Sequence, residues 1–242
     1  MGALLEVANV SKNFSGLRAV SDVTFAVPER AIFAVIGPNG AGKTTLFNMI
    51  AGMFAPDAGS IAFAGERIDG HPPDEVCRRG IGRTFQLVRP FPALTVEDNV
   101  IVGALLRRPD VPSARRNAHD VLRRLDLYDK RAQLASALTL PDRKRLEVAR
   151  ALATDPKLLL LDEVMAGLRP TETNRMVEIL TRMNKESGLT ILLIEHVMRA
   201  VMSLASRVLV LHHGAAIAEG KPETVVREPA VIESYLGAEA VG

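Results

Sequence analysis

Residues 37–44 place the strongest constraint on how this chain can fold. Their sequence, GPNGAGKT, matches the pattern G-x-x-x-x-G-K-[ST] in full. The apolar stretch 31–36 before it predicts a strand, and 43–53 after it, with apolar residues at helical spacing, predicts a helix. Strand, glycine-rich loop and helix in this order form the setting in which such a loop cradles phosphates. The sequence therefore predicts a nucleoside triphosphate site.

Each residue type in this phosphate loop has a chemical reason. Glycines let the backbone wrap closely around phosphate oxygens, which then accept hydrogen bonds from main-chain N–H groups. Lys43 supplies a mobile positive charge for the β- and γ-phosphates, and the Thr44 hydroxyl can ligate Mg²⁺. The following helix points its positive N-terminus at the anion. The predicted nucleotide-binding residues of this segment are Gly37, Pro38, Asn39, Gly40, Ala41, Gly42, Lys43, Thr44 and Thr45.

Short strands alternate with helices in the first and last thirds of the chain. Strands are predicted at 4–10, 20–27, 31–36, 158–161, 190–194 and 207–211, and helices at 43–53, 171–186 and 197–204. Such alternation predicts an α/β fold with a mainly parallel sheet flanked by helices. The stretch from about 96 to 153 reads as helix throughout, so we interpret about 87–155 as a helical subdomain inserted into a single domain spanning 1–242.

Composition excludes several other classes of protein. With 48% hydrophobic and 24% charged residues, the 242-residue chain can bury a core and is not globally disordered. A net charge of +2 argues against a dedicated nucleic-acid binder. The single cysteine, Cys77, cannot form an internal disulfide and fits a reducing cytosol. Apolar runs such as 158–161 and 191–194 are far shorter than the ~20 residues of a membrane helix.

A second acidic element lies at 158–163, where the apolar run LLLL ends in Asp162 and Glu163. Side chains alternate across a strand, so the two carboxylates aim differently. One can approach Mg²⁺ while the other faces the site of an attacking water. An apolar run ending in Asp-Glu is common by itself, but together with a phosphate loop it indicates nucleotide hydrolysis.

These motifs resemble, over nearly the whole chain, the ATP-binding subunits of ABC transporters. Phe14 resembles the aromatic residue that stacks on adenine, and Gln86 in RTFQ resembles the Q-loop glutamine. The segment AGLRP at 166–170 resembles the D-loop, and His196 after ILLIE resembles the switch histidine. Read singly, Phe14 is a core residue, Gln86 a surface residue and His196 a helix-start residue; their joint order favours the functional interpretation.

The resemblance implies an ATPase with a P-loop core, N-terminal antiparallel strands and the inserted helical subdomain. ATP and Mg²⁺ would be its substrate and cofactor. Thr44, Gln86 and Asp162 would ligate the metal, Glu163 would act as general base, and His196 would steady the γ-phosphate and water, with Lys43 and the loop holding the phosphates. The implied partners are a second ATPase subunit in a homo- or heterodimer, membrane permeases contacting 87–99, and indirectly a substrate-binding protein. The implied location is the cytoplasmic face of the cell membrane.

Within that family, four segments resemble the importers of branched-chain (hydrophobic) amino acids. They are RGIGRTFQ at 79–86, LTVEDNV at 94–100, IAEGKPETVV at 217–226 and YLG at 235–237. The ATPases of lipopolysaccharide export share parts of this pattern and are the alternative.

One segment departs from the family pattern. Where the family has LSGGQ, a signature that closes over ATP bound to the opposite subunit, this chain has LTLPD: Leu138, Thr139, Leu140, Pro141 and Asp142. Pro141 lacks an N–H and fixes φ near −65°. We expect Asp142 to place a negative charge near the partner's triphosphate, a repulsion that can exceed ~1 kcal/mol. The simpler interpretation is that Pro141 and Asp142 begin a helix.

The departure leads to a hypothesis of asymmetry. A degenerate signature leaves this chain's own phosphate loop intact but weakens the site built on the partner's loop, so hydrolysis in a heterodimer would occur mainly at Lys43 and Glu163. Val164 replaces the usual proline after Glu163, with a modest effect expected because 166–170 still supplies the turn. A weakly hydrolysing regulatory subunit is the second hypothesis, and a soluble DNA-repair or translation ATPase the third. The rings of His212 and His213 are predicted to point apart.

Overall fold

The central sheet of the molecule is almost entirely parallel. The computed structural model describes residues 2–85 and 90–239. The sheet order is β10-β9-β3-β8-β7-β6, and only the edge strand β10 is antiparallel to its neighbour. Its strands are β3 (Ile32–Ile36), β6 (Ile81–Arg83), β7 (Leu158–Asp162), β8 (Thr190–Ile194), β9 (Arg207–His212) and β10 (Ala215–Gly220). The predicted parallel sheet is confirmed, and β8 begins and ends at the predicted residues.

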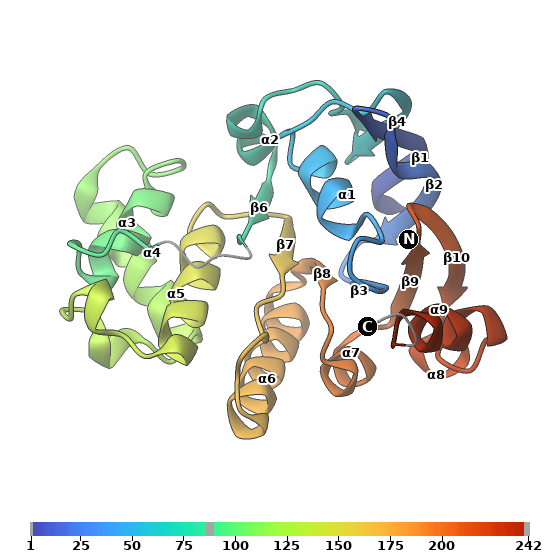
Figure 1. The fold of residues 1–242 in the computed structure, drawn as a ribbon. Helices are drawn as coiled ribbons and strands as arrows, with labels where there is room; N and C mark the ends of the chain where they lie inside the picture. Colours follow the sequence, from blue (N-terminus) through green and yellow to red (C-terminus); the bar gives the residue numbers. More distant parts are fainter. Residues whose placement is uncertain (1, 86–89, 240–242) are drawn as a thin grey trace.

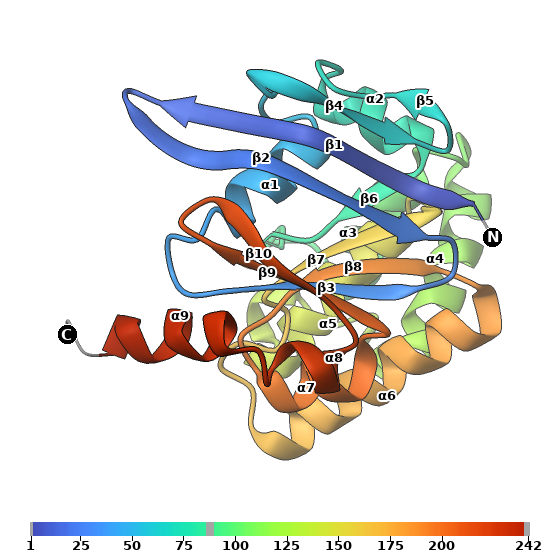
Figure 2. The ribbon, with the colours of Figure 1, turned by 90° about the vertical axis from the view of Figure 1, so that its right-hand side faces the viewer.

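A second sheet is antiparallel and comes mostly from the N-terminal part of the chain. Its order is β2-β1-β4-β5. The strands are β1 (Ala3–Phe14), β2 (Leu17–Pro28), β4 (Ala58–Phe63) and β5 (Glu66–Arg67). Figure 2 shows this sheet lying above the central one, with helix α1 (Lys43–Ile50) between them. The implied N-terminal antiparallel strands are therefore present.

Both faces of the central sheet are buried, which explains why its strands are continuous apolar runs. On β3, Phe33 and Val35 belong to the core shared with α1 and the antiparallel sheet. Ile32, Ala34 and Ile36 belong to the core on the other face. That face is covered by α6 (Pro170–Ser187) and α7 (Met198–Leu204), which lie below the sheet in Figure 2. Side chains that alternate along each strand thus fill two separate cores.

The remaining helices occupy the two ends of the molecule. Helices α3 (Val96–Ala104), α4 (Val111–Arg124) and α5 (Leu140–Leu152) form the helical group at the left of Figure 1. Helices α8 (Pro222–Val225) and α9 (Pro229–Glu239) lie at the opposite end, and α2 (Pro73–Arg79) precedes β6. Within the described ranges, no helix combines the length and apolar character needed to span a bilayer.

The parallel strands bring three loops to one edge of the central sheet. Strand β3 leads into the phosphate loop, β7 ends at Asp162, and β8 is followed by Glu195 and His196. Carboxyl ends of neighbouring parallel strands meet at the same edge, where α/β proteins bind their ligands. The topology therefore places the predicted site residues side by side.

Candidate nucleotide site

The phosphate loop adopts backbone conformations that only glycine can hold. Gly37 has φ 145°, and a Cβ there would lie 2.1 Å from the carbonyl oxygen of Leu211. Gly42 has φ 98°, and its Cβ would lie 2.3 Å from the carbonyl oxygen of Ala19. Helix α1 starts directly after Gly42, so its first N–H groups face the loop. The local sequence thus builds an anion cradle closed by neighbouring backbone.

Lys43 places its ammonium group inside this loop. Its Nζ donates hydrogen bonds to the carbonyl oxygens of Gly37, at 2.7 Å, and Pro38, at 2.9 Å. Burial lowers the pKa of Lys43, while the carboxylates of Glu163 and Asp162 act in the opposite direction. Backbone carbonyls thus hold the Lys43 ammonium group inside the loop. There it adds a full positive charge to the partial charges of the N–H groups that would face phosphate oxygens.

A cleft of about 650 Å³ joins the loop to residues from distant segments. Residues 39–45 line it together with Phe14 from the end of β1 and Glu163 from the end of β7. Phe14 is 38% exposed, and its ring packs edge-to-face on Phe54 at 5.4 Å between centroids. The cleft can therefore hold a phosphate chain with an aromatic ring at one side and a carboxylate at another.

Glu163 and His196 form a close polar pair at the edge of the sheet. His196 Nε2 lies 2.7 Å from Glu163 Oε1. Glu163 has φ 51°, in the left-handed region that costs a non-glycine residue conformational energy. Its backbone N–H donates to the carbonyl of Ile194, and its own carbonyl accepts from Lys144 Nζ at 2.8 Å. These contacts hold the residue in a strained conformation that directs its carboxylate into the cleft.

Asp162 is buried beside Arg83, 3.5 Å from the guanidinium. Burial raises the pKa of Asp162, and the nearby Arg83 partly opposes this. Within residues 2–85 and 90–239, neither carboxylate oxygen accepts a hydrogen bond that meets normal geometry. A buried carboxylate with free lone pairs is suited to a cation. Gln86, the third predicted metal ligand, lies outside the described residues.

The segment LTLPD begins a helix, as the simpler of its two interpretations predicts. Helix α5 begins at Leu140, with Thr139 as N-cap, proline in the first turn and Asp142 among the first-turn acids. The expectation that Asp142 directs a negative charge toward a triphosphate is wrong. Its carboxylate is 2% exposed and forms ion pairs with Lys130 and Arg145, and it accepts a hydrogen bond from Thr139. The charge is thus compensated inside the chain, whereas Leu140 remains 42% exposed.

The two adjacent histidines also differ from expectation. The rings of His212 and His213 lie 4.0 Å apart between centroids, so they do not point apart. His213 follows the end of β9 with φ 48°, and this left-handed turn breaks the strand alternation on which the expectation depended. His213 lines the nucleotide cleft, and so does Arg18, another residue that sequence reasoning missed. Neither residue belongs to a local motif; only the sheet arrangement brings them to the cleft.

Tyr235 makes a further unpredicted contact with the phosphate loop. Burial raises the pKa of this half-buried residue of α9, and the nearby backbone of Gly37 partly opposes the shift. The signal for it in the sequence is weak, because only its place at the start of the YLG segment marks it. The C-terminal helix therefore lies beside the first residue of the loop.

Comparison with known proteins assigns the family. Residues 20–166 match the family described as ABC transporter, and residues 217–241 match one described as branched-chain amino acid ATP-binding cassette transporter. The fold is that of ATP-binding cassettes of known structure. A nucleotide-free cassette from an ABC transporter superposes with a TM-score of 0.89 at 29% identity, covering 97% of this chain and 99% of the other. A cassette in its ADP conformation has the same score and identity, with 98% and 100% covered. The chain thus belongs to the ABC transporter ATP-binding proteins, which are ATPases.

Within this family, the similarity extends to proteins of amino-acid transport. The chain is 39% identical to the high-affinity branched-chain amino acid transport ATP-binding protein LivG of Salmonella typhimurium and 37% identical to BraF of Pseudomonas aeruginosa. Each comparison covers 97% of this chain and 98% of the relative. The lipopolysaccharide export system ATP-binding protein LptB of Haemophilus influenzae is 35% identical over the same shares.

Proposed function

We propose that the nucleotide cleft binds Mg-ATP and hydrolyses it with Glu163 as the general base. The observation that carries this proposal is that one cleft joins the phosphate loop, Phe14 and Glu163, with His196 in contact with that carboxylate. This geometry favours a subunit that hydrolyses ATP over a regulatory subunit that only binds nucleotide.

The residues present fit a magnesium ion. Asp162 offers two buried carboxylate oxygens that lack hydrogen bonds in the described part of the chain, and the Thr44 hydroxyl lies in the cleft. Carboxylate and hydroxyl oxygens are ligands that Mg²⁺ accepts. Thr44 and Asp162, with Gln86 as the third proposed ligand, would hold it. The metal would neutralise charge on the phosphates.

The other residues bind the phosphates, orient the general base and accept a proton from water. Lys43 and the loop amides hold the phosphates, and the N-terminus of α1 adds a positive dipole. Glu163 accepts a proton from the attacking water, and His196 fixes the direction of its carboxylate and steadies the γ-phosphate. Phosphoryl transfer needs mainly such positioning and charge stabilisation.

Two substitutions separate binding from hydrolysis. Lys43→Ala should weaken ATP binding because it removes the only lysine placed in the loop by the sequence motif. Glu163→Gln keeps shape but removes the base, so ATP should still bind while turnover falls by about 10²–10⁴-fold. Fluorescent-nucleotide titration and phosphate release measure the two effects. Full turnover by Glu163→Gln would refute the assigned base.

We further infer that the chain powers import of branched-chain amino acids at the cytoplasmic face of the cell membrane. Its named relatives and the match at 217–241 support this cargo. The partners would be a second cassette, two membrane permeases and, indirectly, a substrate-binding protein. Uptake of labelled leucine by vesicles containing the assembled complex tests this. Lipopolysaccharide release instead of uptake would favour the alternative suggested by the LptB relative.

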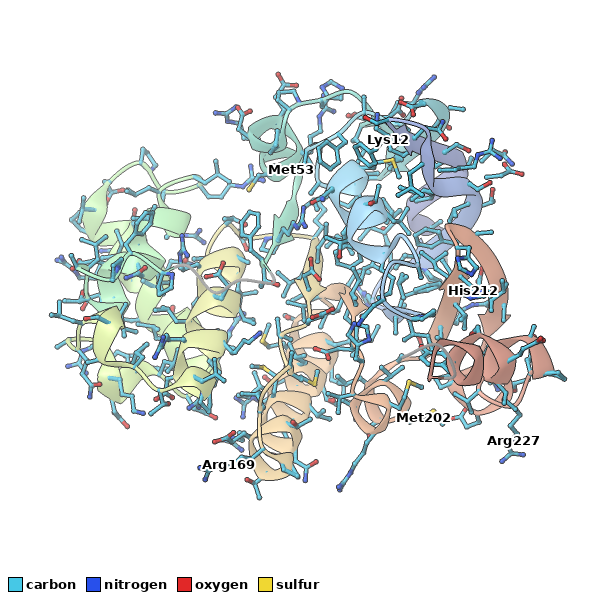
Figure 3. The ribbon with its side chains drawn as sticks, viewed as in Figure 1. Lys12, Met53, Arg169, Met202, His212 and Arg227 are labelled. Atoms are coloured by element: carbon cyan, nitrogen blue, oxygen red, sulfur yellow. The ribbon has the colours of Figure 1, made fainter. Side chains whose placement is uncertain are left out.

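We propose an apolar groove as the docking site of the permeases. It encloses about 250 Å³ between α2, α3 and α5, and its wall includes Met53, Phe85 and Val102. These side chains are 48%, 51% and 47% exposed, high values for large apolar residues. Met53 lies on the side of the core that faces the helical group (Figure 3). An apolar groove with a charged rim suits a short helix from a membrane subunit.

A further inference from the structure

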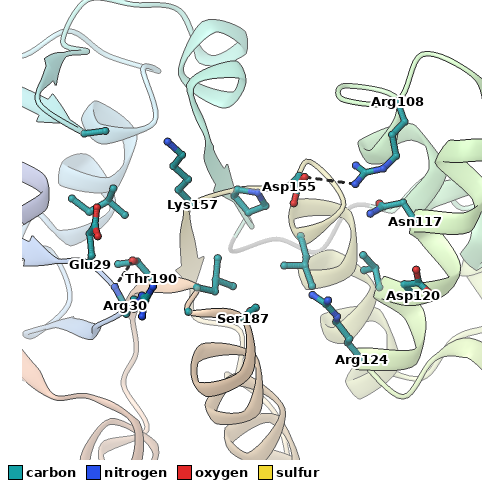
Figure 4. Close-up of a pocket in the computed structure, with 17 residues that line it drawn as sticks. Glu29, Arg30, Arg108, Asn117, Asp120, Arg124, Asp155, Lys157, Ser187 and Thr190 are labelled. Carbon is teal, nitrogen blue, oxygen red and sulfur yellow. Dashed lines mark hydrogen bonds and ion pairs between the residues drawn. The ribbon is translucent and has the colours of Figure 1, made fainter.

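A separate cavity opens at the edge of the central sheet opposite the nucleotide cleft. It encloses about 580 Å³ between the core and helix α4 (Figure 4). Arg30, Lys157 and Thr190 line one side, from the segments that enter β3, β7 and β8. Arg108 and Arg124, just before α4 and at its end, line the other. Its volume falls within the range of small-molecule sites, and we refer to it as the basic cavity.

The basic cavity carries an excess of unpaired positive charge. In the described part of the chain, the side chains of Arg30, Lys157 and Arg124 have no ion pair or hydrogen bond, and Glu29 is the one lining carboxylate without a partner. The other two acids are already engaged. Asp120 pairs with Arg123 at 2.9 Å, and Asp155 lies 3.6 Å from Arg108. The cavity is therefore lined by three cationic side chains without an ion-pair partner among the described residues, and by one such carboxylate.

Two buried polar groups in the same wall also lack partners. Arg108 Nη1 and Asn117 Oδ1 are buried, and neither forms a hydrogen bond to any described residue. Figure 4 shows both side chains extending toward the cavity from the α4 side. A buried guanidinium N–H without an acceptor is unfavourable, and a bound anion would satisfy it.

We propose that the basic cavity binds a small polyanion, a molecule carrying at least two phosphate or carboxylate groups. Guanidinium groups recognise both chemistries with paired N–H donors. Because the cations stand on both sides, one ligand would bridge α4 and the core. Occupancy would hold the helical group against the sheet from the side away from the nucleotide. The assigned site shares no lining residue with the nucleotide cleft.

Titration of the full chain with two probes tests the proposal. Inorganic pyrophosphate and propane-1,2,3-tricarboxylate are titrated calorimetrically into wild type and Lys43→Ala, without EDTA or ADP, because both of these are themselves polyanions that the basic cavity could bind. We expect one polyanion per chain, and the stronger probe identifies phosphate or carboxylate as the preferred group. Arg30→Gln and Arg124→Gln should each weaken that binding about tenfold. Acetate at matched ionic strength should bind to neither wild type nor variants.

Two control variants show whether the probes bind in the basic cavity or elsewhere on the chain. Arg116→Gln changes an exposed arginine of α4 that does not line the cavity, so its affinity should equal that of wild type. Lys43→Ala alters the phosphate loop and should also leave polyanion binding unchanged, whether or not the cleft hydrolyses ATP. Should Arg30→Gln misfold by circular dichroism, Lys157→Gln tests the same side. The proposal would be overturned if the two probes bound no more tightly than acetate. It would also be overturned if Arg116→Gln and Arg124→Gln lost probe affinity equally.

Discussion

Glu195 occupies an unusual place beside the pair formed by Glu163 and His196. Its side chain is 1% exposed; Oε1 accepts a hydrogen bond from the Met165 N–H, and Oε2 has no partner in the described part of the chain. Burial is the main cause that raises its pKa to about 7; Glu163 adds to the effect, and Lys144 opposes it. The carboxyl group is therefore neutral in the folded protein at mildly acidic pH.

This raised pKa predicts a pH-dependent stability. Unfolded, Glu195 loses its proton near pH 4.5, whereas the folded protein keeps it to about pH 7. The folded state binds more protons across that window, so its stability falls as pH rises. Glu195→Gln cannot ionise, so its unfolding free energy relative to wild type should increase by up to about 3 kcal/mol between pH 5 and 8. Urea unfolding at four pH values measures the difference, and a constant difference would contradict the assignment.

His196 should affect turnover more than nucleotide binding. Its imidazole touches Glu163, so its loss should disturb the proposed general base more than the phosphate loop that binds the nucleotide. His196→Ala should lower kcat by about 10²–10⁴-fold because it leaves the general base Glu163 misplaced, with the KM for ATP little changed. His71→Ala, at a partly exposed histidine paired with Glu75, is the matched control. A parallel rise in KM would show that His196 serves binding instead.

Single residues show where sequence reasoning is limited. The helix start at Thr139–Asp142 could be predicted because proline and a first-turn acid act within one turn. The ion pair of Asp142 with Lys130 could not, since it depends on how the preceding segment packs on α5. The strained backbone of Glu163 was likewise invisible, because packing and not residue type imposes it.

Helices α3 and α5 pack unusually closely, and Gly103 makes this possible. A Cβ at Gly103 would lie 2.4 Å from the carbonyl oxygen of Arg150 on α5. In an open helix, glycine to alanine would stabilise by about 1 kcal/mol. Here the clash with backbone should reverse the sign, and Gly103→Ala should destabilise by about 1–3 kcal/mol. Chemical denaturation measures this, with Val102→Ala on the exposed face as control. Increased stability of Gly103→Ala would show that the helices separate freely.

Elements of five or more residues with clear periodicity were predicted well, whereas a very short strand such as β6 and a strand of small residues such as β4 were not. Strand β8 was placed correctly because four consecutive apolar residues, 191–194, follow Thr190 and precede the polar pair Glu195 and His196. Strand β6 has only three residues, and β4 begins with small residues, so neither shows the apolar pattern that predicts a strand. The helix predicted at 43–53 ends at Ile50, because Gly52 with φ 76° turns the chain.

The proposed assembly of two cassettes gives the last prediction. The compensated charge of Asp142 removes one reason for a weak signature, but Pro141 still lacks an N–H and Leu140 still projects where the family has glycine. In a heterodimer whose partner has LSGGQ, the site built on Lys43 and Glu163 should therefore carry most of the turnover. Glu163→Gln in this chain should abolish nearly all ATPase activity, while the equivalent change in the partner should leave more than about half.

A double substitution probes the cause of that asymmetry. Leu140→Gly with Pro141→Gly restores the backbone N–H and the close approach that the partner's nucleotide requires. In a complex whose own site is silenced by Glu163→Gln, this change should raise residual ATPase activity, measured as phosphate release per complex. Asp142 stays in place, so its ion pairs continue to hold the start of α5. Equal loss of activity from silencing either site would contradict the asymmetry, and unchanged residual activity would show that Leu140 and Pro141 are not its cause.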